Sequence, residues 1–219
     1  MGTFRMASSI SLPRLYAILD ASCFADREQM FEAAEQWAKA GVTLLQYRNK
    51  VADAGVMLAE ARGLSERLSR TTVSEPHGLR LIMNDRADLC IAAEFDGVHV
   101  GQGDLSPQSA RKVVGNGRWV GVSTHNAAQV VDADKTSANY IAIGPVFATA
   151  SKQKPDPVVG LAGVREARAL TAKPLVAIGG ITQQNCGAVI DAGADAVAVI
   201  SDLIRDPGKS VEEFLRILG

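Results

Sequence analysis

Cysteine is scarce in this sequence, and long apolar runs and an excess of charge of either sign are lacking. The 219 residues include three cysteines, at positions 23, 90 and 186, with neither a CxxC pair nor the spacing of a metal site. Isolated thiols of this kind exclude a disulfide framework and are typical of small core residues in a reducing cytosol. We therefore predict three buried free thiols and a cytoplasmic location.

No segment approaches the roughly 18 consecutive apolar residues that a membrane-spanning helix needs. Residues 1–13 are too polar and too interrupted for a signal peptide, and we expect a flexible N-terminal arm there. The net charge of -1 leaves no field to attract nucleic acid or an anionic membrane. The expected partners are small molecules, with any anionic ligand held by a few placed cations. Both a monomer and a homo-oligomer stay open.

The sequence does contain a regular alternation of short apolar runs and amphipathic segments. Nearly continuous apolar runs are typical of parallel strands that are covered on both faces. Eight strands are predicted, at residues 15–20, 42–48, 79–85, 97–100, 119–124, 140–146, 174–180 and 196–201. The segments EFDGVHV, SANYIAI and AGADAVAV each lead from a small or polar corner into a strand, which is a weak internal repeat.

The segments between the strands carry the residues that begin and end helices. Three helices are predicted in this way, from Asp26 to Gly41, from Ser106 to Gly115 and from Thr182 to Gly193. Asp26, with a glutamine three residues later, has the pattern of a capping box. The chain therefore alternates strand and helix throughout.

Eight βα units in roughly 200 residues match a single-domain (β/α)8 TIM barrel of the α/β class, which we assign to residues 14–219. The alternative is an open doubly wound sheet with a dinucleotide site. Its best support would be Gly101-x-Gly103, but this motif follows the fourth strand rather than the first, and Asp104 would repel a pyrophosphate. We favour the barrel, in which functional residues gather at the carboxyl ends of the strands.

Cations and acids stand at neighbouring strand ends. The second predicted strand ends in QYRNK, so that Gln46, Arg48 and Lys50 alternate along the strand and form a cationic clamp. Asp85 follows the third strand and Asp104 the fourth; either acid taken alone could be only a helix N-cap or a turn former. Together with the cations they are expected to hold Mg2+ and a diphosphate, because Mg2+ takes one or two carboxylates plus phosphate oxygens.

The other strand ends are also polar. Asn84 ends the third strand and Ser123 the fifth. The sixth leads into a polar loop, residues 147–159, which is long enough to close over a ligand. Gly180 and Ser201 finish the last two strands, where barrels frequently bind phosphate through backbone N–H groups.

In order and register, these strand-end motifs resemble those of the thiamine-phosphate synthase family. The resemblance extends from about Leu15 to Ile204 and is carried by QYRNK, ND at 84 and 85, GQGD ending at Asp104, GVSTH, GPVFATASK and AIGGI. It implies an enzyme that joins 4-amino-2-methyl-5-hydroxymethylpyrimidine diphosphate to a thiazole phosphate, giving thiamine phosphate and diphosphate. Catalysis would be mainly electrostatic stabilisation and positioning, without a protein nucleophile.

The same resemblance implies roles for individual residues. It implies that the pyrimidine diphosphate is held by Gln46, Arg48, Lys50, Asn84, Ser123 and Lys152. It implies that Mg2+ is held by Asp85 and Asp104, and the thiazole phosphate by Thr149, Ser151, Gly180, Ile200 and Ser201. The expected catalytic residues are Arg48, Lys50, Lys152 and Ser123.

Two histidines bear on alternative functions. His99 is expected to pack within the end of the barrel, whereas His125 could be a hydrogen-bonded strand-end residue or a proton carrier. A proton carrier would suit a related thiazole tautomerase, although that enzyme would not need a full diphosphate clamp and two metal-binding acids. A sugar-phosphate epimerase would need paired acid–base groups, and a non-catalytic phosphate-ligand sensor would show no turnover.

Overall fold

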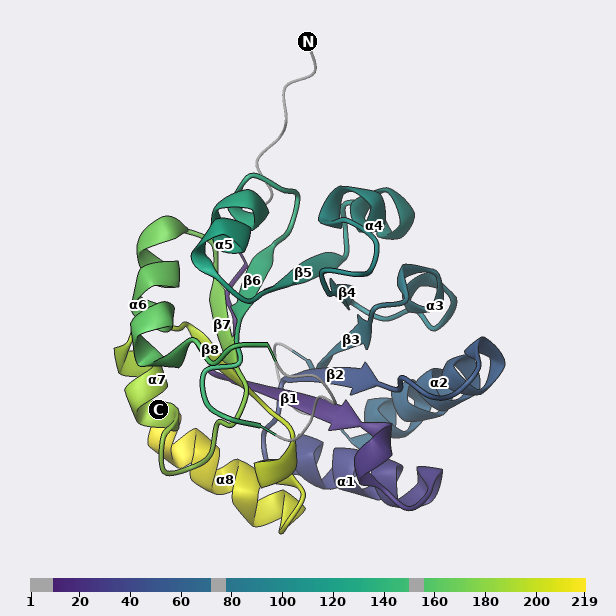
Figure 1. Ribbon diagram of the computed structural model, residues 1–219. Helices are drawn as coiled ribbons and strands as arrows, with labels where there is room; N and C mark the ends of the chain where they lie inside the picture. Colours follow the sequence, from purple (N-terminus) through teal and green to yellow (C-terminus); the bar gives the residue numbers. More distant parts are fainter. Residues whose placement is uncertain (1–9, 72–77, 150–155) are drawn as a thin grey trace.

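The computed structural model describes residues 10–71, 78–149 and 156–219, which form a closed barrel of eight parallel strands surrounded by helices (Figure 1). The strands are β1 (Leu15–Asp20), β2 (Leu44–Arg48), β3 (Arg80–Asn84), β4 (Gly97–Val100), β5 (Trp119–Thr124), β6 (Tyr140–Ile143), β7 (Leu175–Ile178) and β8 (Ala196–Val199). Each strand pairs with the next, and β1 pairs with β8 to close the barrel. The predicted (β/α)8 fold is confirmed, with all eight strands.

Helices follow the strands and cover the outside of the barrel (Figure 1). They are α1 (Arg27–Lys39), α2 (Ala54–Thr71), α3 (Ala87–Ala92), α4 (Pro107–Val114), α5 (Ala127–Asp134), α6 (Gly160–Leu170), α7 (Cys186–Asp191) and α8 (Pro207–Leu218). Short 3-10 turns η1 (Ala21–Cys23) and η2 (Ser201–Leu203) follow β1 and β8. In the described part of the chain, no helix is long and apolar enough to cross a membrane.

Two of the three predicted helix starts are confirmed. The Asp26 side chain caps α1 by accepting a hydrogen bond from the Gln29 N–H at 2.9 Å, and Ser106 caps α4. The third is wrong, because α7 begins at Cys186 rather than after Thr182. The Asn185 side chain accepts a hydrogen bond from the Thr182 N–H at 2.8 Å, which closes a turn ahead of the helix.

The apolar runs of the strands serve two separate cores. On β1, Leu15, Ala17 and Leu19 pack between the barrel and the helices, whereas Tyr16 and Ile18 point into the barrel. Both faces of each strand are therefore covered, which explains why the strands read as nearly continuous apolar runs. The smaller interior cluster contains aromatic and aliphatic side chains from six of the strands, including Tyr16, Leu44, Ile82, Tyr140, Val176 and Ala196.

The predicted arm and thiols have mixed outcomes. Residues 1–9 lie outside the described part of the chain, and Ile10 and Leu12 pack against the interior cluster. Cys90 and Cys186 are buried as predicted, and all three cysteines are free thiols. Cys23 is exposed, contrary to the prediction, because it ends the short turn η1 rather than lying in a strand or against a helix.

The weak internal repeat has a structural cause at the amino ends of the strands. Asp96, Asn139 and Asp195 stand just before β4, β6 and β8. Each accepts a hydrogen bond from a backbone N–H of the preceding strand, at 2.8, 2.8 and 2.7 Å respectively. β4, β6 and β8 are thus each tied to the preceding strand by the same kind of side-chain contact.

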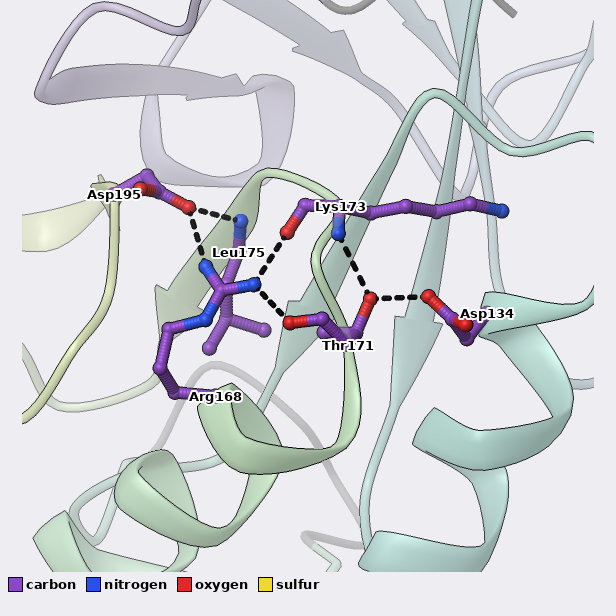
Figure 2. A network of polar contacts seen from close by, with 6 residues as sticks. All are labelled: Asp134, Arg168, Thr171, Lys173, Leu175 and Asp195. Atoms are coloured by element: carbon purple, nitrogen blue, oxygen red, sulfur yellow. Dashed lines mark hydrogen bonds and ion pairs between the residues drawn. The ribbon is translucent and has the colours of Figure 1, made fainter. Parts of the chain in front are cut away.

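Arg168 of α6 extends this tie at β7 and β8 (Figure 2). Its guanidinium donates to Asp195 at 2.8 Å and to the backbone oxygens of Thr171 and Lys173, and Asp195 accepts from the Leu175 N–H. The Thr171 hydroxyl donates in turn to Asp134 at the end of α5. These contacts fasten the base of the barrel at the end opposite to the predicted site.

Candidate active site

Asp20 and Arg48 form a partly buried ion pair at the carboxyl end of the barrel. The two residues lie opposite each other in the parallel register of β1 and β2. Asp20 is 2% exposed, and its carboxylate also accepts a hydrogen bond from the Ser22 hydroxyl at 2.8 Å. The Arg48 guanidinium is therefore held in place by an acid that sequence analysis missed. The sequence did contain a sign of this pair, because Asp20 ends the first strand and Arg48 ends the neighbouring second strand.

Lys50 and Asp85 form a second, more exposed pair, with 2.9 Å between Lys50 Nζ and Asp85 Oδ2. Asp85 has a φ of +60°, a left-handed conformation that residues other than glycine rarely adopt. The Asp85 N–H donates to the His99 carbonyl oxygen at 2.8 Å, which anchors this backbone to β4. Backbone strain of this kind is concentrated at functional sites.

Asp104 lies in the loop after β4, close to Asp85. Its carboxylate accepts a hydrogen bond from the Gly101 N–H at 2.8 Å, and a Cβ atom on Gly101 would lie 2.9 Å from the same oxygen. Partial desolvation raises the pKa of Asp104, and the neighbouring Asp85 side chain raises it further, whereas the Gly101 N–H and Lys50 lower it. The carboxylates of Asp85 and Asp104, which follow the adjacent strands β3 and β4, thus lie close together, as sequence analysis predicted.

The donor set of these two acids fits Mg2+. Both supply hard oxygen ligands, and a divalent cation between them would relieve the unfavourable interaction that raises the pKa of Asp104. No group of three or more His, Cys, Asp or Glu side chains suited to a metal occurs among the residues that the structure describes. Phosphate and water would therefore have to complete the coordination, as is usual for Mg2+.

Five side chains from five strands form what we call the interior chain, a series of hydrogen bonds through the barrel. Gln46 Nε2 donates to the Tyr16 hydroxyl at 2.8 Å, and the Tyr16 and Tyr140 hydroxyls are 3.0 Å apart. His99 lies between Tyr140 and Ser123, with Nδ1 3.1 Å from the Tyr140 hydroxyl and Nε2 2.8 Å from Ser123 Oγ. The predicted residues Gln46 and Ser123 are thus connected by three residues that sequence analysis did not assign to the site.

Burial keeps the interior chain uncharged. It lowers the pKa of His99 to about 4, and it raises the pKa of the Tyr16 and Tyr140 hydroxyls above the ordinary value. His99 is 7% exposed, so its predicted place within the barrel end is confirmed. Asn84, also 7% exposed, ends β3 beside His99 in the strand register.

The residues predicted to hold the second phosphate lie after β6, β7 and β8. Thr149 and Ile200 are half-buried, and Ser201 is exposed at the start of η2. Gly180 has a φ of +62°, and a Cβ atom there would lie 2.5 Å from the Ala148 carbonyl oxygen. Gly180 therefore has a packing role in addition to any role in binding. Two predicted residues, Ser151 and Lys152, lie outside the described part of the chain.

His125 is bound to the backbone and to a loop acid. Its Nδ1 is 2.6 Å from the Gly144 carbonyl oxygen, and its Nε2 is 3.5 Å from Asp156 Oδ2. With both ring nitrogens engaged, the side chain is a hydrogen-bonded strand-end residue in this structure. This geometry favours the structural interpretation of His125 over that of a proton carrier.

Known proteins resemble this chain along nearly its whole length. A sequence model for thiamine monophosphate synthase matches residues 15–203. A thiamine-phosphate synthase of Koribacter versatilis is 56% identical over 216 residues, which cover 97% of this chain and 99% of the relative. One of Chloroflexus aurantiacus is 40% identical over 193 residues, which cover 87% of this chain and 85% of the relative.

Solved structures agree with this similarity. The thiamine phosphate pyrophosphorylase of Pyrococcus furiosus has a TM-score of 0.80 and 28% identity, and the match covers 94% of this chain and 95% of that one. A 3-hexulose-6-phosphate synthase has a TM-score of 0.69 at 16% identity, with 94% of this chain and 100% of that one covered. The second likeness shows the fold alone.

Proposed function

Because the chain belongs to the thiamine-phosphate synthase family, we propose that the carboxyl end of its barrel joins a pyrimidine diphosphate to a thiazole phosphate. The chain is an enzyme of thiamine biosynthesis with thiamine-phosphate synthase activity. The single observation that carries the proposed site is the meeting of two cations, Arg48 and Lys50, with two acids, Asp85 and Asp104, at the ends of β2, β3 and β4. This arrangement suits a diphosphate leaving group.

The cations stabilise the diphosphate as negative charge gathers on it. Arg48 is held by Asp20, so its guanidinium is preorganised, whereas the half-exposed Lys50 can turn from Asp85 towards a phosphate. Preorganised charges of this kind are usually the largest contribution to catalysis. Lys152 would add a third cation from the loop after β6.

Mg2+ would be held by Asp85 and Asp104, where it would neutralise charge on the leaving diphosphate. Gln46, Asn84 and Ser123 would hold the pyrimidine ring and orient its methylene carbon towards the second substrate. The bond from this carbon to the diphosphate oxygen breaks while the electron-rich aminopyrimidine supports positive charge on the carbon, and the thiazole nitrogen then attacks it. Carbon–nitrogen bond formation therefore balances carbon–oxygen bond cleavage, and the electron pair leaves with the diphosphate.

The thiazole phosphate would lie at the ends of β7 and β8. Gly180, Ile200 and Ser201 follow β7 and β8, where TIM barrels commonly bind phosphate, and Thr149 follows β6. We propose that Ser151, from the same sequence motif as Thr149, also binds this phosphate. The two anionic groups would then occupy separate parts of the barrel mouth. The partners are small molecules rather than nucleic acid or membrane, and a homo-oligomer stays a prediction. A cytoplasmic location is supported by the three free thiols.

The test is a reaction of the purified protein with both substrates and Mg2+, with thiamine phosphate detected by mass spectrometry. Product is expected only when both substrates and the metal are present. Absence of product, when a synthase of known activity succeeds under the same conditions, would refute the proposal.

His125→Gln separates the synthase from a tautomerase. Because both ring nitrogens already contact Gly144 and Asp156, we expect this variant to retain most synthase turnover. Interconversion of thiazole phosphate tautomers, measured on the same preparation, should be negligible in the wild-type protein. A large loss of synthase turnover in a folded variant would assign His125 to the reaction.

A further inference from the structure

The interior chain contains three residues, Tyr16, Tyr140 and His99, whose polar groups lie inside the barrel rather than at its mouth. All three are buried, and each makes two side-chain hydrogen bonds within the chain. Burying a polar group costs free energy of folding unless the group is fully hydrogen-bonded, so a series of this length indicates a function. The direction of its hydrogen bonds indicates what that function is.

The proton order is determined from the Gln46 end. An amide nitrogen only donates, so the Tyr16 oxygen accepts from Gln46, and the Tyr16 hydrogen is left for the Tyr140 oxygen. The Tyr140 hydrogen then goes to His99 Nδ1, which must be unprotonated to accept it. In the neutral imidazole the remaining hydrogen is on Nε2, which donates to Ser123 Oγ. The hydroxyl proton of Ser123 is therefore free to be donated to a ligand.

The opposite end of the interior chain presents an acceptor. Because Gln46 Nε2 is committed to Tyr16, the amide carbonyl oxygen Oε1 is its remaining polar atom, and no hydrogen bond to Oε1 is found among the described residues. In the described part of the chain, every buried side-chain oxygen or nitrogen has a hydrogen-bond partner. Because Oε1 has none there, it is not buried, and it is open to a ligand or to water. The two ends thus have opposite and fixed hydrogen-bonding character.

We propose that Tyr16, Tyr140 and His99 are positioning residues that fix Ser123 as a hydrogen-bond donor and Gln46 as an acceptor, and thereby select an amino-substituted pyrimidine over its oxo analogue. This inference rests on the proposed function. An aminopyrimidine offers the N–H of its amino group to the Gln46 acceptor and the lone pair of a ring nitrogen to the Ser123 donor. The oxo analogue offers a carbonyl and a ring N–H, and would leave buried polar groups mismatched.

The barrel is built to admit this arrangement. A Cβ atom on Gly121 of β5 would lie 2.1 Å from Tyr140 Cζ and 2.5 Å from His99 Nδ1. The absence of a side chain at Gly121 therefore lets the Tyr140 ring cross the interior. The rings of His99 and Tyr140 stack with their centroids 5.5 Å apart, which fixes the orientation of the imidazole.

The test removes one hydroxyl. Tyr140→Phe keeps the ring but leaves His99 Nδ1 without its hydrogen-bond donor. His99 can then carry its proton on Nδ1 instead of Nε2, and the Ser123 hydroxyl can donate to Nε2 rather than to the ligand. We expect kcat/KM for the aminopyrimidine diphosphate to fall about tenfold, and the preference over the 4-oxo analogue to fall by a similar factor. Tyr47→Phe is the matched control, because that buried tyrosine bonds to Glu60 outside the chain. It should leave the preference unchanged.

A double-mutant cycle distinguishes positioning from general damage. In a Ser123→Ala background, Tyr140→Phe should cause no further loss of kcat/KM, since the proton that it misplaces is already gone. The KM for the thiazole phosphate should stay unchanged throughout. Additive losses, or an unchanged amino-to-oxo preference, would overturn the proposal. Tyr16→Phe also lowers the amino-to-oxo preference, which guards against misfolding of one variant, but because it frees the Gln46 amide it should still lower kcat/KM in the Ser123→Ala background.

The tautomer of His99 can be measured without any turnover. Nitrogen-15 NMR of histidine-labelled protein at neutral pH should show His99 protonated at Nε2, with a mixture of tautomers in Tyr140→Phe. Protonation at Nδ1 in the wild-type protein would overturn the proposed proton order. A wild-type protein without synthase turnover would instead overturn the proposed function, and with it the aminopyrimidine as the ligand, while the NMR result would still decide the proton order.

Discussion

Asp85 combines three features in one residue: a left-handed backbone, an ion pair with Lys50 and the neighbouring Asp104. Asp85→Asn keeps the size of the side chain but weakens its hold on Mg2+. We expect kcat to fall by about 10²- to 10³-fold, the usual effect of losing one preorganised electrostatic group. Added Mg2+ should restore part of the loss by mass action. Normal turnover across a titration that begins at limiting metal would contradict the assignment.

Lys50→Gln is the comparison variant for that titration. It should also lower kcat, but added Mg2+ should not restore the rate, because the metal ligands are intact. Arg48 is less suitable, since its removal would leave the buried Asp20 without its ion-pair partner and would destabilise the protein itself. Restoration of Lys50→Gln by Mg2+ would mean that this lysine acts mainly by keeping Asp85 in place.

His99 makes stability dependent on pH. Its pKa is about 4 in the folded protein, below the ordinary value of 6.5, because burial disfavours the charged ring. Between these values the unfolded chain binds a proton that the folded chain does not. The free energy of unfolding should therefore fall as the pH falls from about 6.5 to 4, by about 3 kcal/mol from this residue.

Urea denaturation across this pH range would measure the effect of His99. His99→Gln should be less stable at neutral pH, because it interrupts the interior chain, yet its stability should change less between pH 6.5 and 4. Carboxylates titrate in the same range in both proteins, so the difference between the two curves reports the histidine together with its interaction with Asp104. Parallel curves would contradict the assigned pKa.

The residues of the site differ in how far the sequence could predict them. Gln46, Asp85 and Asp104 could be predicted because each is polar at the end of an apolar run. Tyr16 and Tyr140 lie within apolar runs, where the sequence pattern indicates a buried strand and gives no sign of a polar site. Their hydroxyl partners depend on closure of the barrel and on the space beside Gly121, neither of which is a local property of the sequence.

At the scale of elements, we propose that the turns after β7 and β8 bind the second substrate, the thiazole phosphate. Ser201→Asp would place a negative charge at the start of η2, where we propose that the thiazole phosphate binds. The KM for that substrate should rise at least about tenfold, with little change in the KM for the pyrimidine diphosphate. Ser69→Asp, on the exposed face of α2, is the matched control. Equal increases in both KM values would contradict the assignment.

The elements themselves were predicted well where the signal is local. The strands and the starts of α1 and α4 follow from apolar runs and capping residues that act within a few positions. The start of α7 was missed because Thr182 and Asn185 are both acceptable caps, and only the folded turn shows which one precedes the helix. β6 ends at Ile143 and β7 at Ile178, three and two residues before their predicted ends at 146 and 180. After β7, the positive φ of Gly179 takes the backbone out of the extended conformation.

At the scale of the whole molecule, one set of stabilising contacts lies at the end of the barrel opposite to the proposed site. Asp195→Ala removes the acceptor for the Leu175 N–H and a partner of Arg168 (Figure 2). We expect the free energy of unfolding to fall by about 1–3 kcal/mol, because the backbone donor loses its hydrogen bond, while kcat stays unchanged.

Thermal or urea unfolding, together with a turnover assay, would check this separation. Asp132→Ala is the control, because the exposed Asp132 side chain pairs with the exposed Lys135 and its removal should cost little stability. A large loss of turnover in folded Asp195→Ala would show that the base of the barrel also controls the mouth.

The hydrogen bonds that the Asp96, Asn139 and Asp195 side chains accept join β3 to β4, β5 to β6, and β7 to β8. The connection through α4, between β4 and β5, carries none of them. A circular permutant with new termini at residues 115–117, and the original ends fused by a linker, would keep all three fastenings. Residues 115–117 are thus a position at which a designer could cut the gene, insert a second domain, or recombine modules of two strands without breaking these three hydrogen bonds.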